Sequence, residues 1–264
     1  MLIGGTKNDP TPNSVEKAAV QDPFFEIKIS EEYKPVGRDL FWTKELTKEE
    51  AEKPIFFKRD FALVSYVIPK RGAVPDMLTE TESAMIPSFT IATNPMTKEN
   101  ISLEDLEDRG RKTISLQEDR EVYRALQVAV QEAHRITCSE EEIGRAFRIA
   151  IALIEEHLLT VETVTCHTFE RQIYEDLVKS YNEKNPNRPL RLVVSVMCPR
   201  HSAYFLAKKE FLGRFIVFKD VEVQPCDDPK ALRKGLVLSE DIGVAVMNDY
   251  ALSHIYISND LKEE

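Results

Sequence analysis

Residues 116–134 have the sequence LQEDREVYRALQVAVQEAH, in which apolar side chains recur at steps of three and four residues. Charged residues fill much of the remaining surface, including an unbroken run at 118–121. This period places the apolar side chains on one face of a helix. The stretch therefore predicts a long amphipathic helix within residues 102–136, which are helical in character. Its inward positions are Val122, Leu126, Ala129, Val130 and Ala133.

A second helix is predicted directly after this one, because Ser139 is followed three residues later by Glu142. Such a pair forms a capping box, in which the hydroxyl accepts an N–H of the first turn and the glutamate accepts the serine N–H. A third helix is predicted from Phe169 to Tyr181. The inward positions are Ile143, Phe147, Ala150, Ile151, Ile154 and Leu158 in the second helix, and Phe169, Ile173, Leu177 and Val178 in the third.

The period changes to that of strands after residue 189. Residues 190–197, LRLVVSVM, have a buried-strand pattern, and 201–211 predict a short helix that ends near Gly213. Helices that alternate with such strands are typical of an α+β chain whose helices pack on a sheet. The remaining predicted strands are 215–218, 221–223 after a turn at 219–220, 236–238, 244–247 and 254–257.

Residues 60–101, which precede the long helix, have an extended character. A β-rich run at 61–68 ends at Pro69, and a second run at 84–93 ends at Asn94-Pro95. A long polar connection joins the two runs. The pattern predicts a hairpin-like projection that has little core of its own.

Residues 1–56 are irregular, with a polar, turn-rich start and short apolar islands. A floppy terminus is one interpretation. We favour an arm that docks on another surface, such as a neighbouring subunit, because a disordered arm does not need so many aromatic side chains. These aromatic residues are Phe24, Phe25, Phe41, Trp42, Phe56 and Phe57.

Composition narrows the class of protein. The 264 residues are 42% hydrophobic and 30% charged, which is typical of a soluble globular chain. No apolar run approaches the roughly 18 residues that a membrane span needs, and no secretory signal is visible, so we expect a cytoplasmic site of synthesis and action. The net charge of −10 disfavours a nucleic-acid-binding surface, because such binding depends on Lys and Arg.

Motifs for catalysis or cofactor binding are missing from the sequence: it has no phosphate-binding loop, no nucleophile elbow and no zinc-binding His pair. Cys198 and His201 have the residue types of a nucleophile and a base, or of two metal ligands, but Cys198 ends an apolar strand. Cys166 beside His167 is best explained as a buried thiol next to a half-exposed imidazole. The acidic residues at 226–229 fit a solvated turn. The four cysteines lack a Cys-x-x-Cys pair and are expected to be buried thiols.

The order of these segments resembles that of the major capsid proteins of tailed bacteriophages, a fold shared with encapsulins. An aromatic arm precedes a β projection, a long helix, a helix–strand block and terminal strands. The resemblance covers most of residues 57–258, although Cys198 stands where that family usually has Asn. Residues 78–87 with 89–91 are similar to the family's extended E-loop, and Leu103–Arg135 is similar to its spine helix. Residues 194–199 with 204–206 are similar to a characteristic strand and the helix that follows it. Residues 213–218 with 241–257 are similar to the closing strands.

The resemblance implies an α+β, phage major-capsid-like fold. It comprises an N-terminal arm, an extended β-hairpin E-loop, a peripheral domain with a long spine helix, and an axial domain with a central sheet flanked by helices. The implied boundaries are 1–56 for the arm, 57–101 for the E-loop, 102–137 for the spine helix and its lead-in, 138–258 for the axial domain with strands returning to the peripheral domain, and 259–264 for the tail.

The function that the resemblance implies is structural, without catalysis, cofactor or metal. Subunits would self-assemble through pentamers and hexamers into an icosahedral virion shell that encloses double-stranded DNA without specific recognition. Portal, scaffolding or decoration proteins would be further partners, and a membrane would not. An encapsulin-type compartment holding protein cargo is the alternative, and a Cys/His hydrolase is a lesser one. Candidate inter-subunit contacts are Phe24, Phe25, Phe41, Trp42, Met77, Leu78, Met85, Ile86 and Phe89.

Overall fold

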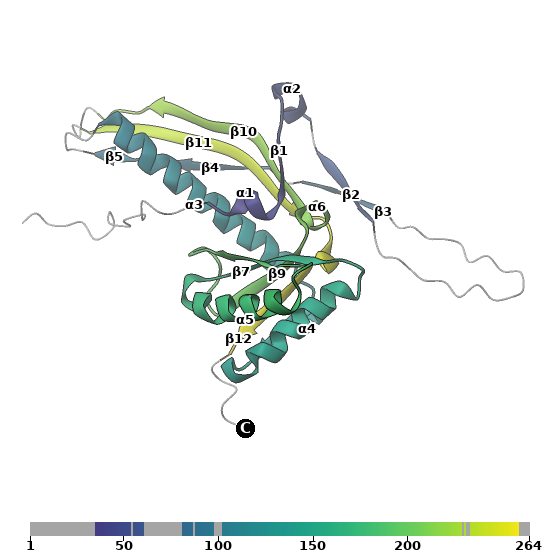
Figure 1. Ribbon diagram of the computed structural model, residues 1–264. Helices are drawn as coiled ribbons and strands as arrows, with labels where there is room; N and C mark the ends of the chain where they lie inside the picture. Colours follow the sequence, from purple (N-terminus) through teal and green to yellow (C-terminus); the bar gives the residue numbers. More distant parts are fainter. Residues whose placement is uncertain are drawn as a thin grey trace, which may run out of the picture. The chain divides into compact units, whose positions relative to one another are not determined.

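Figure 1 shows the computed structural model of the chain. The described residues are 35–53, 55–60, 81–86, 88–97, 102–228, 230 and 233–258; for 56–60, 81–85 and 97 the description covers the backbone alone. The predicted strand at 61–68 therefore lies outside the described residues, as do the candidate contacts Phe24, Phe25, Met77 and Leu78.

The predicted long helix is a single element, α3, which runs from Leu103 to Ala129. Ser102 caps it, because its hydroxyl accepts the N–H of Asp105 at 3.0 Å. The helix ends earlier than the sequence pattern predicts: residues 132–134 form the short 3-10 helix η1 (Glu132–His134), and Ala133 is exposed. The inward face holds Val122 and Leu126 as predicted.

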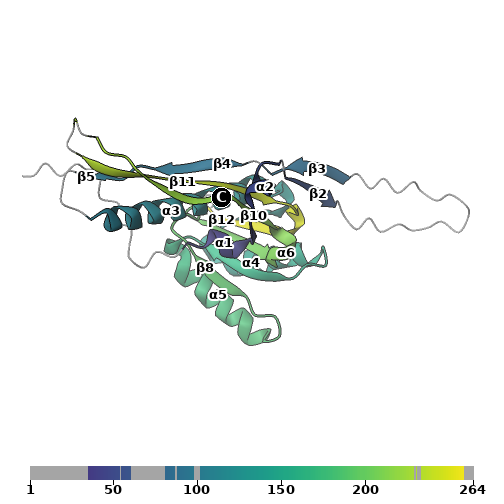
Figure 2. The same cartoon turned by 90° about the horizontal axis from the view of Figure 1, so that it is seen from above.

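The first sheet has the strand order β1-β10-β11-β4, with β5 paired to β11. Helix α3 lies along one face of this sheet, against β11 and β4 (Figures 1 and 2). Gly110 permits this contact, because a Cβ at that position would lie 2.4 Å from a methyl carbon of Leu238. The strands are β1 (Trp42–Glu45), β4 (Phe89–Thr93), β5 (Met96–Thr97), β10 (Gly213–Pro225) and β11 (Lys234–Val246).

Two strand predictions in this sheet are wrong in the same way. The predicted turn at 219–220 is an irregularity inside the continuous strand β10, with register shifts between Val217 and Lys219 and between Lys219 and Glu222. Residues 234–246 likewise form one strand, β11, instead of two. A polar pair such as Lys219-Asp220 fits a bulge because bulged residues leave the ladder locally without ending the strand.

The predicted strand at 84–93 is divided between two sheets. Residues 81–85 form β3 (Thr81–Met85), which pairs antiparallel with β2 (Phe56–Asp60) as the base of the predicted hairpin. Residues 89–93 form β4, which pairs instead with β11. Ile86 lies between them, where its N–H donates to the carbonyl of Ile55 at 2.9 Å. The division follows from the different pairing partners of the two halves.

The second sheet has the order β6-β12-β9-β7-β8, and helices α4 and α5 pack on it. The predicted helix at 201–211 is wrong: residues 202–207 form a central strand whose six residues are all buried. Periodicity cannot separate a short, fully buried strand from a buried helix. The elements are β6 (Arg135–Cys138), β7 (Val161–Cys166), β8 (Arg191–Val194), β9 (Ser202–Ala207), β12 (Leu252–Ile257), α4 (Ile143–Glu155), α5 (Arg171–Lys184) and the short α6 (Lys209–Leu212).

The starts of α4 and α5 follow the sequence signals with local differences. The capping box of Ser139 and Glu142 is present, with a 3-10 turn η2 (Glu140–Glu142) before α4. Leu158 is 81% exposed and lies beyond the end of α4 with a positive φ of 61°, so it is not part of the inward face. Phe169 is in the 3-10 turn η3 (Thr168–Glu170) before α5 and is 70% exposed, whereas Tyr174 points inward.

Candidate functional site

The first described residues of the chain are held against α3 and β11 by hydrogen bonds and ion pairs to buried carboxyl groups. Arg38 belongs to the short helix α1 (Gly37–Leu40). Its Nη2 contacts Glu118 Oε1 at 2.7 Å and Glu240 Oε1 at 2.6 Å, and its Nε donates to Glu118 Oε2 at 3.2 Å. Bidentate pairing of this kind fixes the orientation of the guanidinium as well as its position.

Asp119 holds the backbone of the same segment. Its Oδ1 accepts the N–H of Val36 at 3.0 Å and that of Gly37 at 2.6 Å. A Cβ on Gly37 would lie 2.8 Å from Asp119 Oδ1 and 2.9 Å from a methyl carbon of Val122, so a side chain at this position would push the segment away. We call Arg38, Glu118, Asp119 and Glu240 the anchor cluster.

The anchor cluster has more buried carboxyl groups than cations. Glu118 is 3% exposed and Glu240 is fully buried, yet Arg38 is the guanidinium that contacts both. Burial, together with the hydrogen bond and the charge of Glu118, raises the pKa of Glu240 to about 8. The raised pKa favours the protonated form of Glu240, because an uncompensated buried carboxylate is costly.

The side chains predicted to contact neighbouring subunits fall into different environments. Phe41 is fully buried in the main core, where its ring lies against Gly213, so it has no surface to offer a neighbour and that prediction is corrected. Ile86 is 3% exposed and packs with Ile216 and Ala245, and the same correction applies. Both residues are used to join their own segments to the first sheet.

Trp42, Phe89 and Met85 remain as predicted contacts within the described residues. Trp42 is 39% exposed, and the guanidinium of Arg214 lies 4.5 Å from the centre of its ring. Phe89 is partly buried and lines a groove of about 470 Å³ together with residues of the short helix α2 (Lys48–Ala51). Only the backbone of Met85 is described.

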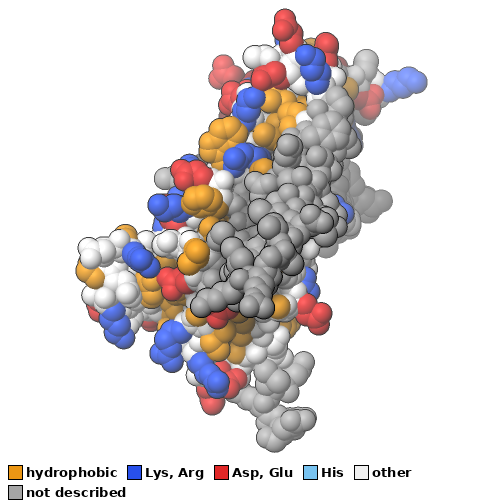
Figure 3. Space-filling view, turned by 90° about the vertical axis from the view of Figure 1, so that its right-hand side faces the viewer, with side chains coloured by type: hydrophobic (Ala, Val, Ile, Leu, Met, Phe, Trp, Pro, Cys, Tyr) orange, Lys and Arg blue, Asp and Glu red, His pale blue; other side chains and the backbone are white. Residues whose placement is uncertain are grey.

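Several exposed hydrophobic side chains were missed by the sequence analysis. On the face shown in Figure 3, hydrophobic side chains are interspersed with charged ones. Val128 is 79% exposed because it lies on the outer face of α3, out of phase with Val122 and Leu126; that phase is readable from the sequence. Among the residues that the structure describes, the other large exposed hydrophobic side chains are Leu103, Ile149, Leu158, Phe169, Val196, Phe211 and Tyr256.

The Cys198–His201 pair lacks the environment of a catalytic dyad. The Cys198 thiol is buried and donates to the carbonyl of Ser202 at 3.6 Å. Burial, with a contribution from Cys166, raises its pKa well above the ordinary value, which opposes formation of the nucleophilic thiolate. His201 Nδ1 lies instead 3.5 Å from Glu170 Oε1.

Cys166 and His167 also lack the environment of a catalytic pair. Burial raises the pKa of the Cys166 thiol to about 12. His167 is 7% exposed, so the prediction of a half-exposed imidazole is wrong; its Nδ1 accepts the N–H of Phe169 at 3.1 Å and thereby caps η3. Cys138 is buried and Cys226 is partly exposed. Within the described ranges, no group of three or more metal-ligating side chains is placed to hold an ion.

The helices of the described chain are all too short or too polar to cross a bilayer. No protein-family profile and no curated protein matches the sequence. Solved structures do resemble it. The capsid structure of the cyanophage P-SCSP1u matches with a TM-score of 0.57 at 11% identity, over 84% of this chain and 87% of that one.

Two further structures show the same likeness. The mature capsid of bacteriophage PhiM1 matches with a TM-score of 0.59 at 8% identity, over 98% of this chain and 91% of the other. A virus-like particle from Pyrococcus furiosus matches with a TM-score of 0.51 at 12% identity, over 82% and 90%. With its two mixed sheets and its long helix α3, the chain has the fold of the phage major capsid proteins.

Proposed function

We propose that the protein is a structural shell subunit that self-assembles through pentamers and hexamers into an icosahedral capsid around a double-stranded DNA genome. The observation that carries this proposal is the likeness of fold to phage capsids over most of both chains. The acidic net charge of −10 is consistent with a DNA genome that is enclosed without being gripped. The virion would be its location, with portal, scaffolding or decoration proteins as further partners.

In this proposal the segments differ in their roles. The hairpin of β2 and β3 begins the projection predicted at 57–101, and α3 forms the spine predicted within 102–137. The anchor cluster fixes residues 36–40, so the part of the predicted arm that can reach a neighbour is shorter than 1–56. Contacts through Phe24, Phe25, Trp42, Met77, Leu78, Met85 and Phe89 stay predictions.

Electron microscopy of the overexpressed protein tests the shell directly. We expect uniform hollow particles, and a monodisperse monomer at high protein concentration would contradict the proposal. Deletion of residues 1–34 leaves the anchor cluster in place, so this variant should remain folded by circular dichroism while particle formation is lost. Particles of normal size from the truncated chain would contradict a role of the arm in assembly.

A second candidate function is a nanocompartment that holds protein cargo. The likeness to the virus-like particle from Pyrococcus furiosus, at a TM-score of 0.51, is compatible with either kind of shell. The contents of purified particles separate the two candidates. Nuclease-protected DNA supports the capsid, and a co-purifying cargo protein in place of DNA supports the compartment.

A further inference from the structure

The second sheet has a row of residues at which its parallel strands end together. Cys138 in β6 pairs with Ile257 in β12, and Cys166 in β7 pairs with Val194 in β8. The N–H of Ile257 donates to the carbonyl of His201 at 2.8 Å, which joins the two halves of the row. The loops that follow β6, β7 and β8 therefore leave the sheet at the same end. We call this end of the sheet the loop end.

Two adjacent loops at the loop end present an exposed aromatic ring with a cation on it. Phe169, in the turn after β7, is 70% exposed. The guanidinium of Arg200, in the loop after β8, lies 4.5 Å from the centre of this ring, and the His167 imidazole stacks on the ring with 5.1 Å between centres. Val196, in the same loop as Arg200, is 46% exposed. We call Phe169, Val196 and Arg200 the stacked patch.

Buried groups hold the two loops of the stacked patch in fixed positions. Glu170 is 5% exposed, and its Oε1 accepts the N–H of His201 at 3.0 Å. His201 has a φ of 60°, a left-handed conformation that residues other than Gly adopt at a cost. Such a conformation persists where the surrounding structure imposes it, and it is concentrated at functional sites. The stacked patch is therefore preorganised for a contact.

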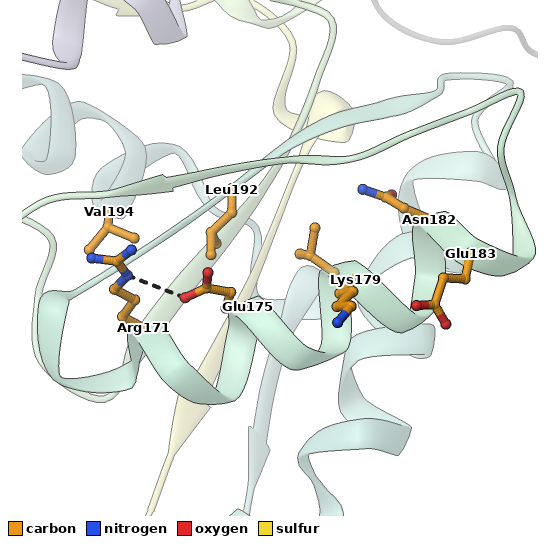
Figure 4. A pocket seen from close by; sticks show the side chains of 8 residues that line it. Arg171, Glu175, Lys179, Asn182, Glu183, Leu192 and Val194 are labelled. Atoms are coloured by element: carbon orange, nitrogen blue, oxygen red, sulfur yellow. Dashed lines mark hydrogen bonds and ion pairs between the residues drawn. The ribbon is translucent and has the colours of Figure 1, made fainter.

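The charge of Arg200 is available to a partner. The nearby Arg171, in the first turn of α5, is paired with Glu175 and lies beside Val194 at the end of β8 (Figure 4). Glu170 is engaged by His201. No ion pair among the described residues includes Arg200. Arg and aromatic side chains are enriched at the centres of protein–protein contacts, so the stacked patch fits a partner with negative charge.

Acidic side chains occupy the other side of the loop end. Glu140, Glu141 and Glu142 form the turn η2 directly after β6, and all three are exposed. In the order β6-β12-β9-β7-β8, β6 is three strand spacings, or roughly 14 Å, from β7. The dipole of α4 accounts for acidic residues at its start, but it does not account for an exposed patch of opposite charge on the other side of the same sheet. We call these three residues the acidic turn.

We propose that the stacked patch of one copy of this chain docks on the acidic turn of the next copy around a rotational symmetry axis. The proposal rests on the proposed function, because it names a contact within the pentamers and hexamers of the shell. Contacts between two unlike surfaces run head to tail and close into a ring when the rotation allows it. Glu142 is held in the capping box, so Arg200 pairs with Glu140 and Glu141, while Phe169 is removed from water.

Two charge-reversal variants test this contact. The negative variant carries Arg200→Glu and presents acidic groups on both sides of the loop end. The positive variant carries Glu140→Lys and Glu141→Lys and presents basic groups on both sides. Every head-to-tail contact of either variant alone joins like charges. In a mixture the two variants can alternate around a hexamer, so that opposite charges meet at every contact, whereas a pentamer keeps one contact between like charges.

We expect each variant alone to assemble poorly, with an association constant about tenfold lower per contact, which corresponds to ~1.4 kcal/mol. The mixture should form hexamers with equal numbers of the two variants, measured by native mass spectrometry, but no closed shells. The combined variant with all three substitutions is the matched control. It restores opposite charges within one kind of chain, so it should form shells again in the electron microscope. Circular dichroism checks that each variant is folded.

Normal shells from the negative variant alone would overturn the proposed contact. A folded combined variant that does not assemble would overturn it as well. In both cases particles from the wild-type chain still support the shell, whereas a monomeric wild-type chain contradicts the proposed function itself. The two proposals therefore fail in different ways.

A cross-linking experiment tests the same contact without charge reversal. The variant Glu141→Cys/Arg200→Cys is treated with a bismaleimide too short to span the roughly 14 Å between the two sides of one sheet. A head-to-tail contact gives a series of covalent products that ends at pentamers and hexamers, whereas a two-fold contact gives dimers alone. The two single-cysteine variants are the controls and should not give the series. Dimers alone, or no product beyond those of the controls, would overturn the proposal.

Discussion

Strand β9 in the second sheet and the N-terminal segment at the first sheet are held by different contacts: apolar burial dominates at β9, whereas buried carboxyl groups contribute at the N-terminal segment. In the second sheet, all six residues of β9 are buried, and the ring of Phe205 packs edge-to-face on Phe147 with ring centres 5.1 Å apart. In the first sheet, the N-terminal segment is held by the anchor cluster, in which charged groups are buried together. The stability that apolar burial contributes does not depend on pH, whereas the stability that the anchor cluster contributes does. The comparison indicates that the root of the arm can be loosened while the second sheet stays intact.

Removal of a core ring from the second sheet is expected to have the largest effect. Phe205→Ala deletes a fully buried side chain and leaves a cavity beside Phe147, which should lower the free energy of unfolding by about 3–5 kcal/mol. Denaturant unfolding followed by circular dichroism measures the change. Phe169→Ala, at a position that is 70% exposed, is the matched control and should cost less than about 1 kcal/mol. Equal losses for both variants would contradict the assignment of the core.

The anchor cluster should make stability depend on pH. The pKa of Glu240 is about 8 in the folded chain and 4.5 ordinarily, so the folded state binds more protons between these values. This contribution to stability is complete below pH 4.5 and is lost as pH rises to about 8, for a total on the order of a few kcal/mol.

Glu240→Gln tests this dependence, because the amide keeps the shape of the protonated acid and does not titrate. Unfolding measured from pH 5 to pH 9 should show a weaker decline for the variant than for the wild-type chain. Glu107→Gln, on the exposed part of α3, is the control and should leave the decline unchanged. Parallel curves for wild type and Glu240→Gln would show that Glu240 does not titrate in this range.

Asp119→Ala should loosen the root of the arm locally. It removes the carboxylate that accepts the N–H groups of Val36 and Gly37, a charge-assisted interaction whose loss costs about 1.5–3 kcal/mol. Hydrogen exchange should accelerate at residues 36–40 while β9 keeps its protection. Asp108→Ala, on the outer face of the same helix, is the control. Faster hydrogen exchange throughout both sheets would mean that the anchor cluster stabilises the whole fold and not only residues 36–40.

The helices were predictable because their signals are local. The spacing of Val122 and Leu126 gave α3, and the pair of Ser139 and Glu142 gave the start of α4. The strand β9 was not predictable, because a six-residue stretch buried on both faces has no alternation by which to recognise a strand. The continuous strands β10 and β11 were missed because polar residues within them resemble turns.

The anchor cluster was missed because its members are far apart in the sequence. Arg38 is 80 residues from Glu118 and 202 residues from Glu240, and each alone looks like a surface charge. One signal was present: Asp119 precedes Val122 by three residues, which places a carboxylate on the inward stripe of α3. A charged residue in phase with a buried face is a reason to look for a distant partner.

Trp42→Ala should have the smallest effect on the isolated subunit. The side chain is 39% exposed and its ring meets Arg214, a contact worth about 0.5–1 kcal/mol at such sites. If Trp42 also contacts a neighbour, as predicted, the variant should lose more free energy of assembly than free energy of unfolding, because a buried Trp at an interface commonly contributes at least about 2 kcal/mol. Light scattering during assembly, compared with thermal unfolding of the subunit, separates the two effects.

The control variant Arg214→Ala removes the same internal contact while keeping the indole. It should therefore match the loss of stability without the loss of assembly. Equal assembly by both variants would place Trp42, like Phe41, among the residues that serve their own subunit.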